Sequence, residues 1–187
     1  MKFYLVRHGE SKGNIRKEFS GIKNVDLTDK GLEQAEIMAE KFDDIDINKI
    51  FASPLIRAQK TAKAIAKRQN HEIITIDKLH ERNFGLIEGM NWDEIEKKYP
   101  EEAIKLINDR EDYTFPEGES VEDVAMRGKD FYNLHQKDLD GSVIVAHACF
   151  ILCFLFGIEV LDKYELLNTK INNCDVICLE DGKLTYI

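Results

Sequence analysis

An apolar run ends on an arginine and a histidine in residues 2–9, KFYLVRHG. The run predicts a strand at about 2–8, and Gly9 lets the backbone turn sharply after it. Arg7 matches a phosphate group with its rigid fork of N–H donors. A neutral His8 imidazole is a nucleophile that can form a covalent phospho-intermediate. On its own, this triplet fits an ordinary strand end as well as it fits catalysis.

Two more hydrogen-bond donors follow strand-like segments. Asn14 falls in the first turn of a predicted short helix after His8, where amide and backbone donors face the same anion. Arg57 belongs to residues 51–62, FASPLIRAQKTA, which predict an apolar strand, a Ser-Pro turn and the start of a helix.

A second histidine and a carboxylate complete the set. His147 closes residues 142–147, SVIVAH, the most apolar predicted strand, and Glu81 lies in the glycine-rich loop of residues 80–89. In an open α/β sheet, the carboxyl ends of the strands gather at one crevice where ligands bind. The sequence therefore predicts a single site.

Predicted strands and helices alternate along the chain. The strands are expected at 2–8, 49–53, 71–77, 142–147, 174–180 and 183–187. The longer helices are expected at 29–42, 55–69, 120–137 and 149–157, with short ones after Asn91 and Pro100. This order predicts an α/β fold, a three-layer α/β/α sandwich with a mostly parallel central sheet. Residues 82–119 are predicted to form a small helical cap over the crevice, within one domain that spans residues 1–187.

Taken together, the motifs resemble the histidine phosphatase superfamily, the phosphoglycerate-mutase-like group, over nearly the whole chain. The motifs are Arg7-His8-Gly9, Ser53-x-x-x-Arg57-Ala58, the Glu81 loop, His147, Phe19-Ser20-Gly21, the segment 26–35 and Pro116-Glu117-Gly118-Glu119-Ser120. Each motif is modest, but their order and spacing are highly specific.

The resemblance implies a role for each matching residue. His8 would attack phosphorus as a neutral imidazole, with Arg7 and Arg57 lowering its pKa and a carbonyl near Gly9 holding its other N–H. Glu81 would protonate the leaving alkoxide and then activate water, a role that requires a raised pKa. The phosphate pocket would consist of Arg7, Arg57, Asn14 and His147, with Ser20, Gly21, Arg82 and Ala148 as further substrate or phosphate contacts.

One departure concerns the last motif, where the family usually has His-Gly-Gly and this chain has His147-Ala148-Cys149. Alanine supplies the same backbone N–H if its φ is negative. A positive φ would cost about 1 kcal/mol and displace the pocket.

Two branches of the family are weighed against each other. In the mutase branch, adjacent arginines hold a second acidic group, whereas the like-placed residues here are Asn108, Asp109 and Arg110. Residues 84–89 and 116–120 look more like the phosphatase branch, which includes α-ribazole-phosphate and broad-specificity phosphatases. We therefore expect hydrolysis of small-molecule phosphomonoesters through a phosphohistidine. The alternatives are a cofactor-dependent phosphoglycerate mutase, and a non-catalytic relative that binds a phosphorylated ligand or a protein.

The composition of the chain limits which binding partners and which compartment are expected. The chain has 187 residues, 43% of them apolar, and a formal net charge of −9. An acidic chain without a basic stripe is not expected to bind nucleic acid. The start of the chain predicts no signal peptide, and residues 142–161 predict a buried strand and helix and no membrane span, so we expect a cytoplasmic enzyme. No metal or organic cofactor is expected, and the oligomeric state is left open.

The four cysteines and the aromatic residues of the cap allow two readings each. Cys149 and Cys153, and Cys174 and Cys178, are spaced for zinc or for a buried core, and we favour reduced, buried thiols. Oxidation of Cys149 would then disturb the nearby site.

The aromatic residues of the cap form either a wall for an aromatic or nucleoside-like leaving group or simply the packing of the cap; they are Phe84, Trp92, Tyr113 and Phe115.

Overall fold

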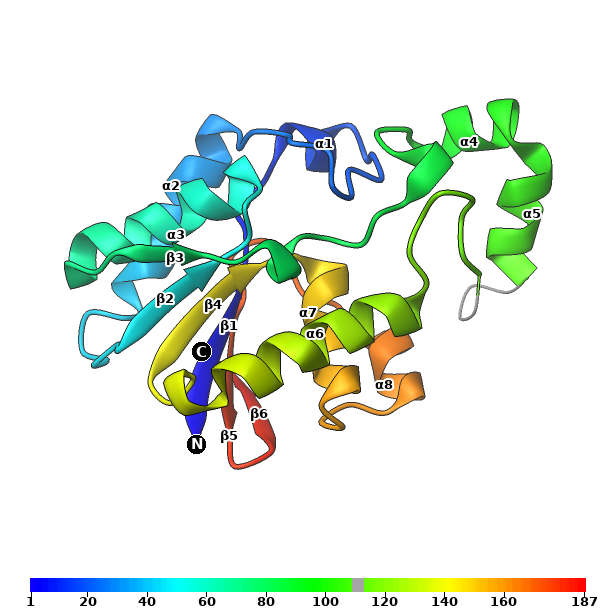
Figure 1. Cartoon of the computed structure of the whole chain (residues 1–187). Helices are drawn as coiled ribbons and strands as arrows, with labels where there is room; N and C mark the ends of the chain where they lie inside the picture. Colours follow the sequence, from blue (N-terminus) through cyan, green and yellow to red (C-terminus); the bar gives the residue numbers. More distant parts are fainter. Residues whose placement is uncertain (109–112) are drawn as a thin grey trace.

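A computed structural model describes residues 1–108 and 113–187 (Figure 1). A six-stranded sheet has the order β3-β2-β4-β1-β5-β6. Its strands are β1 (Lys2–Arg7), β2 (Lys49–Ala52), β3 (Ile73–Thr75), β4 (Ser142–Ala146), β5 (Val176–Glu180) and β6 (Lys183–Tyr186). The first four strands run parallel to one another, whereas β5 is antiparallel to β1 and β6 is antiparallel to β5. This arrangement confirms the mostly parallel sheet.

Helices cover both faces of the sheet. The α-helices are α1 (Lys12–Ile15), α2 (Asp29–Glu40), α3 (Ile56–Gln69), α4 (Trp92–Lys98), α5 (Pro100–Asn108), α6 (Val121–His135), α7 (Ala148–Gly157) and α8 (Lys163–Asn168). Short 3-10 turns span η1 (Asp77–Leu79), η2 (Gly85–Ile87) and η3 (Gln136–Asp138). Successive strand residues point to opposite faces, so Phe3 and Leu5 pack with α6 and α7. Tyr4 and Val6 pack with α2 and α3 on the other face, which gives the predicted three layers.

The structure differs from the predicted elements at a few places. Helix α8 was not predicted, although Asp162 and Glu165 form a capping box that marks its start in the sequence. Strand β5 begins at Val176 and not at Cys174, because Cys174 has a φ of +60°, outside the extended region. Cys174 and Cys178 still join the apolar cluster beneath β1, as expected. All four cysteines are free thiols.

Residues 82–119 carry a small apolar core of their own. Ile87, Ile95, Ala103 and Phe115 are buried together, apart from the two clusters that flank the sheet. The ends of the segment are tied to each other, since the Asn83 N–H donates to the Glu119 carboxylate and the Glu119 N–H donates to the Asn83 carbonyl. Figure 1 shows α4 and α5 standing beyond the sheet, with α4 on the side nearer to the loop that follows α1.

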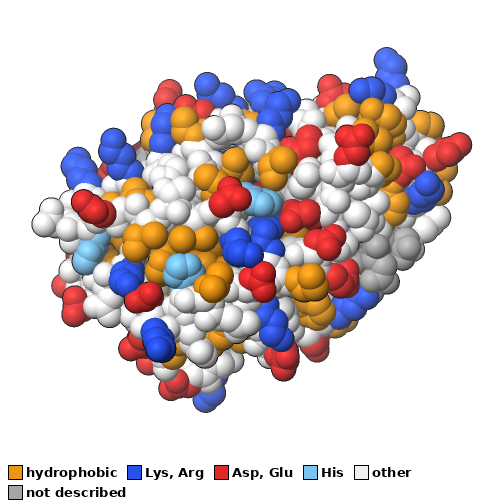
Figure 2. Space-filling view, in the orientation of Figure 1, with side chains coloured by type: hydrophobic (Ala, Val, Ile, Leu, Met, Phe, Trp, Pro, Cys, Tyr) orange, Lys and Arg blue, Asp and Glu red, His pale blue; other side chains and the backbone are white. Residues whose placement is uncertain are grey.

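Charge is mixed on the face that Figure 2 shows, where acidic and basic side chains are interspersed. This face therefore presents no large patch of a single sign of charge. In the part of the chain that the structure describes, no helix combines the length and apolarity needed to cross a membrane.

Candidate active site

Three neighbouring strands bring the predicted residues together. His8 follows β1, Ser53 follows β2 and His147 follows β4, and these strands are adjacent and parallel. The backbone N–H of His8 donates to the carbonyl of Ala146 over 3.1 Å. The imidazole rings of His8 and His147 consequently lie with their centroids 5.1 Å apart.

Hydrogen bonds fix the tautomer of His8. Its Nδ1 lies 2.7 Å from the carbonyl oxygen of Gly9, an acceptor only, so Nδ1 carries the proton. Its Nε2 accepts from the Nε–H of Arg57 over 3.2 Å. Burial lowers the pKa of His8 well below its ordinary value, and the charges of Arg57 and Arg7 lower it further. The imidazole is therefore neutral near pH 7, with the Nε2 lone pair facing the arginine.

Arg57 is almost fully buried and is held from both sides of its guanidinium. Its Nη1 donates to the carbonyl of Lys23 over 2.8 Å, and its Nη2 donates to the carbonyl of Gly21 over 2.6 Å. Gly21 has a φ of +43°, and a Cβ there would stand 1.7 Å from the Glu88 carboxylate. Position 21 therefore requires glycine, and the contact it makes in this structure is with Arg57.

Arg7 and Asn14 flank the nucleophile on the other side. Arg7 donates from Nη1 to the carbonyl of Ile171 over 2.6 Å. The Oδ1 of Asn14 accepts from the Ser11 N–H and from Asn173, which leaves its amide N–H groups for another partner. Asn173 also donates to the His8 carbonyl over 3.0 Å. Sequence reasoning missed Asn173, because a pair of asparagines before a strand carries no distinguishing pattern.

His147 is fully buried beside His8. Its Nε2 lies 2.7 Å from the hydroxyl of Ser53, a partner that the motif contained but to which no role was given. Burial lowers the pKa of His147 well below its ordinary value, and the charge of Arg57 adds to the effect. Helix α7 begins at Ala148, which has no positive φ, so the alanine introduces no strain. Of the two cases considered for this departure, the structure has the one without a positive φ.

Glu81 is mostly buried, at 9% exposure, and reaches the start of α7. Its carboxylate accepts from the N–H groups of Phe150 (2.8 Å), Arg82 (2.9 Å) and Cys149 (3.2 Å). The first amides of a helix attract negative charge, which accounts for this placement.

The loop that carries Glu81 is anchored by Arg127, which sequence reasoning missed. Arg127 of α6 donates to the carbonyls of Lys78 (2.6 Å) and His80 (2.9 Å), and it pairs with the carboxylate of Glu119. Only its place on the buried side of an amphipathic helix sets it apart from a surface arginine, and the sequence gives no sign of these partners.

A pocket of about 170 Å³ is enclosed by seven of the predicted residues, namely Arg7, His8, Asn14, Ser20, Gly21, Arg57 and Glu81. Around it, three buried polar atoms lack a hydrogen-bond partner among the described residues: Arg7 Nε, Ser20 Oγ and His147 Nδ1. Such atoms are costly unless a ligand satisfies them. Together with the two guanidinium groups, they fit an oxyanion such as phosphate.

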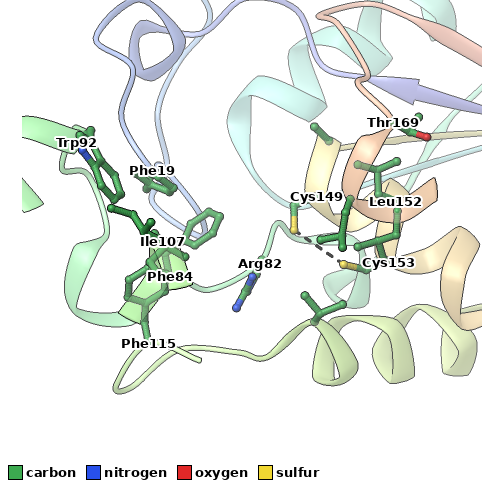
Figure 3. A pocket seen from close by; sticks show the side chains of 15 residues that line it. Phe19, Arg82, Phe84, Trp92, Ile107, Phe115, Cys149, Leu152, Cys153 and Thr169 are labelled. Atoms are coloured by element: carbon green, nitrogen blue, oxygen red, sulfur yellow. Dashed lines mark hydrogen bonds between the residues drawn. The ribbon is translucent and has the colours of Figure 1, made fainter. Parts of the chain in front are cut away.

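Three predicted residues do not line this pocket: His147 lies beside His8, and Arg82 and Ala148 line a neighbouring cavity of about 650 Å³ (Figure 3). Arg82 already donates to the carbonyls of Glu119 and Tyr113, so much of its hydrogen-bonding capacity holds the cap. Within residues 1–108 and 113–187, no group of three or more His, Cys, Asp or Glu side chains is placed to hold a metal ion.

Comparisons with known proteins agree with this geometry. Residues 3–183 match the model of the histidine phosphatase superfamily (branch 1). The 2,3-bisphosphoglycerate-dependent phosphoglycerate mutase of Bartonella tribocorum is 33% identical over 178 residues, covering 89% of this chain and 85% of that protein. Phosphoserine phosphatase 1 of Hydrogenobacter thermophilus is 32% identical over 188 residues, covering 98% of this chain and 89% of that protein.

The fold is shared with solved structures as well. The α-ribazole phosphatase of Shigella flexneri superposes with a TM-score of 0.88 at 21% identity, and the match covers 100% of this chain and 95% of the other.

Proposed function

Because this chain belongs to the histidine phosphatase superfamily, we propose that it hydrolyses small-molecule phosphomonoesters through a phosphohistidine at His8. The observation that carries the proposal is the state of His8. Its proton is held on Nδ1 by the Gly9 carbonyl, and its Nε2 lone pair lies in a pocket with two arginines. A neutral nucleophile beside a phosphate clamp is what the first step of such a reaction needs.

The proposed first step forms a bond between Nε2 of His8 and phosphorus while the bond from phosphorus to the alcohol oxygen breaks. The Nε–H of Arg57 turns from Nε2 to a phosphoryl oxygen, and Arg7, Asn14 and His147 donate to the others. Glu81 enters this step as the carboxylic acid, and its proton passes to the departing alkoxide; the N–H groups of Phe150, Arg82 and Cys149 then hold the carboxylate that remains.

The second step returns the enzyme to its starting state. Glu81, now ionised, takes a proton from water, the water oxygen bonds to phosphorus, and the bond to Nε2 breaks. Free phosphate leaves, and Glu81 again holds the proton. Atoms and charge balance over the cycle without a metal ion or an organic cofactor.

Phosphoglycerate mutase is the second candidate, because a mutase is among the relatives with one third identical residues. In the mutase branch, paired arginines of the cap bind a second acidic group. Of the like-placed residues here, Asn108 is uncharged, and Asp109 and Arg110 lie outside the described residues. Hydrolysis is favoured because the described lining of the neighbouring cavity is mostly apolar.

The cap and the cellular compartment belong to the same proposal. We take residues 82–119 as the part of the single domain that sets specificity, since they furnish one side of that cavity. Four free cysteines support a reducing compartment such as the cytoplasm.

Phosphate release from a panel of phosphomonoesters, measured with EDTA present, tests the proposal. Wild type should release phosphate and accumulate acid-labile phosphate on His8. His8→Ala should lose at least about 10⁴-fold in rate, whereas His71→Ala, at the end of α3 outside the pocket, should keep it. Interconversion of 3-phosphoglycerate without phosphate release would establish the mutase instead. Neither activity from folded protein would leave a binding role.

A further inference from the structure

The cavity beside the phosphate pocket has two walls of different origin (Figure 3). One is aromatic and comes from the cap and the loop after α1, with Phe19, Phe84, Trp92 and Phe115. The other comes from α7 and α8 and includes Leu152, Cys149 and Cys153. A volume of about 650 Å³ lies within the range of ligand sites and far exceeds that of the phosphate pocket.

The lining offers little to a charged ligand. Among the described residues that line the cavity, only Arg82 is charged, and its Nε and Nη2 already donate to carbonyls of the cap. The hydrogen bond to Cys153 and burial raise the pKa of the Cys149 thiol well above its ordinary value, so this wall stays neutral. A carboxylate placed here would lose its hydration and gain at most the Nη1 donor of Arg82, and an ammonium group would gain no charged partner among the described lining residues.

The cavity and the phosphate pocket adjoin each other. Phe19 and Phe84 line both. Cys149, which lines the cavity, donates its N–H to Glu81, which lines the pocket. The apolar cavity therefore lies next to the place where an alcohol would leave phosphorus beside Glu81. Tyr113 packs on Phe115 at a centroid distance of 4.9 Å and does not line the cavity.

We propose that the preferred substrates are monophosphates of bulky, uncharged, apolar alcohols, of which an arylalkyl alcohol is the type. The proposal rests on the hydrolytic function above and narrows its substrates. It places small esters with a second charged group, such as 3-phosphoglycerate or O-phosphoserine, among the poor substrates.

A series of primary alkyl phosphates separates the cavity from the chemistry, since their leaving alcohols have similar acidity. The kcat/KM for 2-phenylethyl phosphate should exceed that for ethyl phosphate by at least about tenfold, because the phenyl group is removed from water in the cavity. Phosphate release with equal values for the two esters, or with higher values for 3-phosphoglycerate or O-phosphoserine, would overturn this substrate class while leaving hydrolysis intact.

Leu152→Ser makes the cavity wall polar on the partly buried side of α7. The ratio of kcat/KM for the two esters should fall at least about threefold, the effect of roughly one lost methylene contact. Leu134→Ser changes the same residue type at a site on α6 that is 71% exposed, and it should keep the wild-type ratio. An unchanged ratio in Leu152→Ser, with the thermal midpoint retained, would contradict the proposal.

Trp92 provides a readout that needs no turnover, because it is the only tryptophan of the chain and lines the cavity. Its fluorescence should change saturably with 2-phenylethylphosphonate, a non-hydrolysable analogue, at a Kd at least about tenfold below that of ethylphosphonate. If the protein binds the phenylethyl analogue more tightly but hydrolyses none of the esters, the result would support the apolar binding site and contradict the proposed hydrolytic function. Equal Kd values would overturn the apolar site.

Discussion

The phosphate pocket and the apolar cavity adjoin each other but are built by different means. In the pocket, the side chains of Arg7, His8, Arg57 and Glu81 each have a hydrogen bond with a backbone group that fixes their direction, as between His8 and Gly9 or Arg57 and Gly21. In the cavity, the shape comes from packing of side chains such as Phe84 and Leu152. Directional bonds hold a geometry to within tenths of an ångström, whereas packing tolerates other residues of similar volume. The pocket therefore fixes the reaction, and the cavity is free to vary the substrate.

Glu81 lines the phosphate pocket and is bonded to Cys149 of the apolar cavity. Its substitution should give the largest difference between the kcat/KM values of two esters. Glu81→Gln keeps much of the hydrogen bonding to α7 but has no proton for the leaving alkoxide. The kcat/KM for ethyl phosphate should fall about 10³-fold, while that for 4-nitrophenyl phosphate, whose leaving group needs no proton, falls less than about tenfold.

A burst of 4-nitrophenol is also expected from Glu81→Gln, because water attack on the phosphohistidine becomes slow. Glu72→Gln, on the exposed surface before β3, is the matched control. Equal losses with both esters would show that Glu81 is not the acid.

Arg57→Lys tests the pocket alone. A lysine cannot reproduce the fork that reaches His8, Gly21 and Lys23, so a stabilising donor to the phosphoryl group is lost. All esters should lose kcat/KM by a similar factor of about 10², whatever their leaving group. Arg68→Lys, at a surface pair with Asp43, should change it less than about twofold. A loss confined to apolar esters would contradict the division between pocket and cavity.

The sequence predicted the pocket better than the cavity for a physical reason. Residues such as His8 and His147 directly follow buried strands, and parallel strands bring their ends to one edge whatever the helices do. The family resemblance then supplied their roles. Asn173 and Arg127 carry no such mark, because their partners are backbone carbonyls far away in the chain.

The cavity could be anticipated only as one of two possibilities. The aromatic residues of the cap were predicted either to pack together or to line a substrate site, and Phe84 and Phe115 do both. The opposite wall comes from α8 and the thiols of α7, and the meeting of these elements depends on tertiary packing. A helical periodicity does not state what its apolar side contacts.

Arg127→Gln should reproduce the loss of Glu81 in weaker form. Without Arg127, the carbonyls of Lys78 and His80 lose a shared donor and the Glu81 loop is less well positioned. The kcat/KM for ethyl phosphate should fall about tenfold, while that for 4-nitrophenyl phosphate stays within about twofold. Lys129→Gln, an exposed change on the same helix, should alter neither. Equal losses with both esters, together with a lower thermal midpoint, would indicate a purely structural role.

The smallest effect concerns stability and again distinguishes the pocket from the rest of the molecule. His8 and His147 are buried, and burial lowers both pKa values well below those of the unfolded chain. Between the folded and unfolded pKa values the unfolded state binds more protons, so the free energy of unfolding decreases as pH falls below about 6.5. Each histidine contributes up to about 1.4 kcal/mol per pH unit.

Urea unfolding at pH 7.5, 6.5 and 5.5 should show this dependence, and His147→Gln should remove about half of it. Burial raises the pKa of Glu88, and this shift makes the free energy of unfolding increase as pH falls toward the pKa of an unfolded glutamate. The measurements therefore stop at pH 5.5. His71→Gln should keep the wild-type slope, and a slope unaffected by His147→Gln would mean that His147 is not held neutral by the fold.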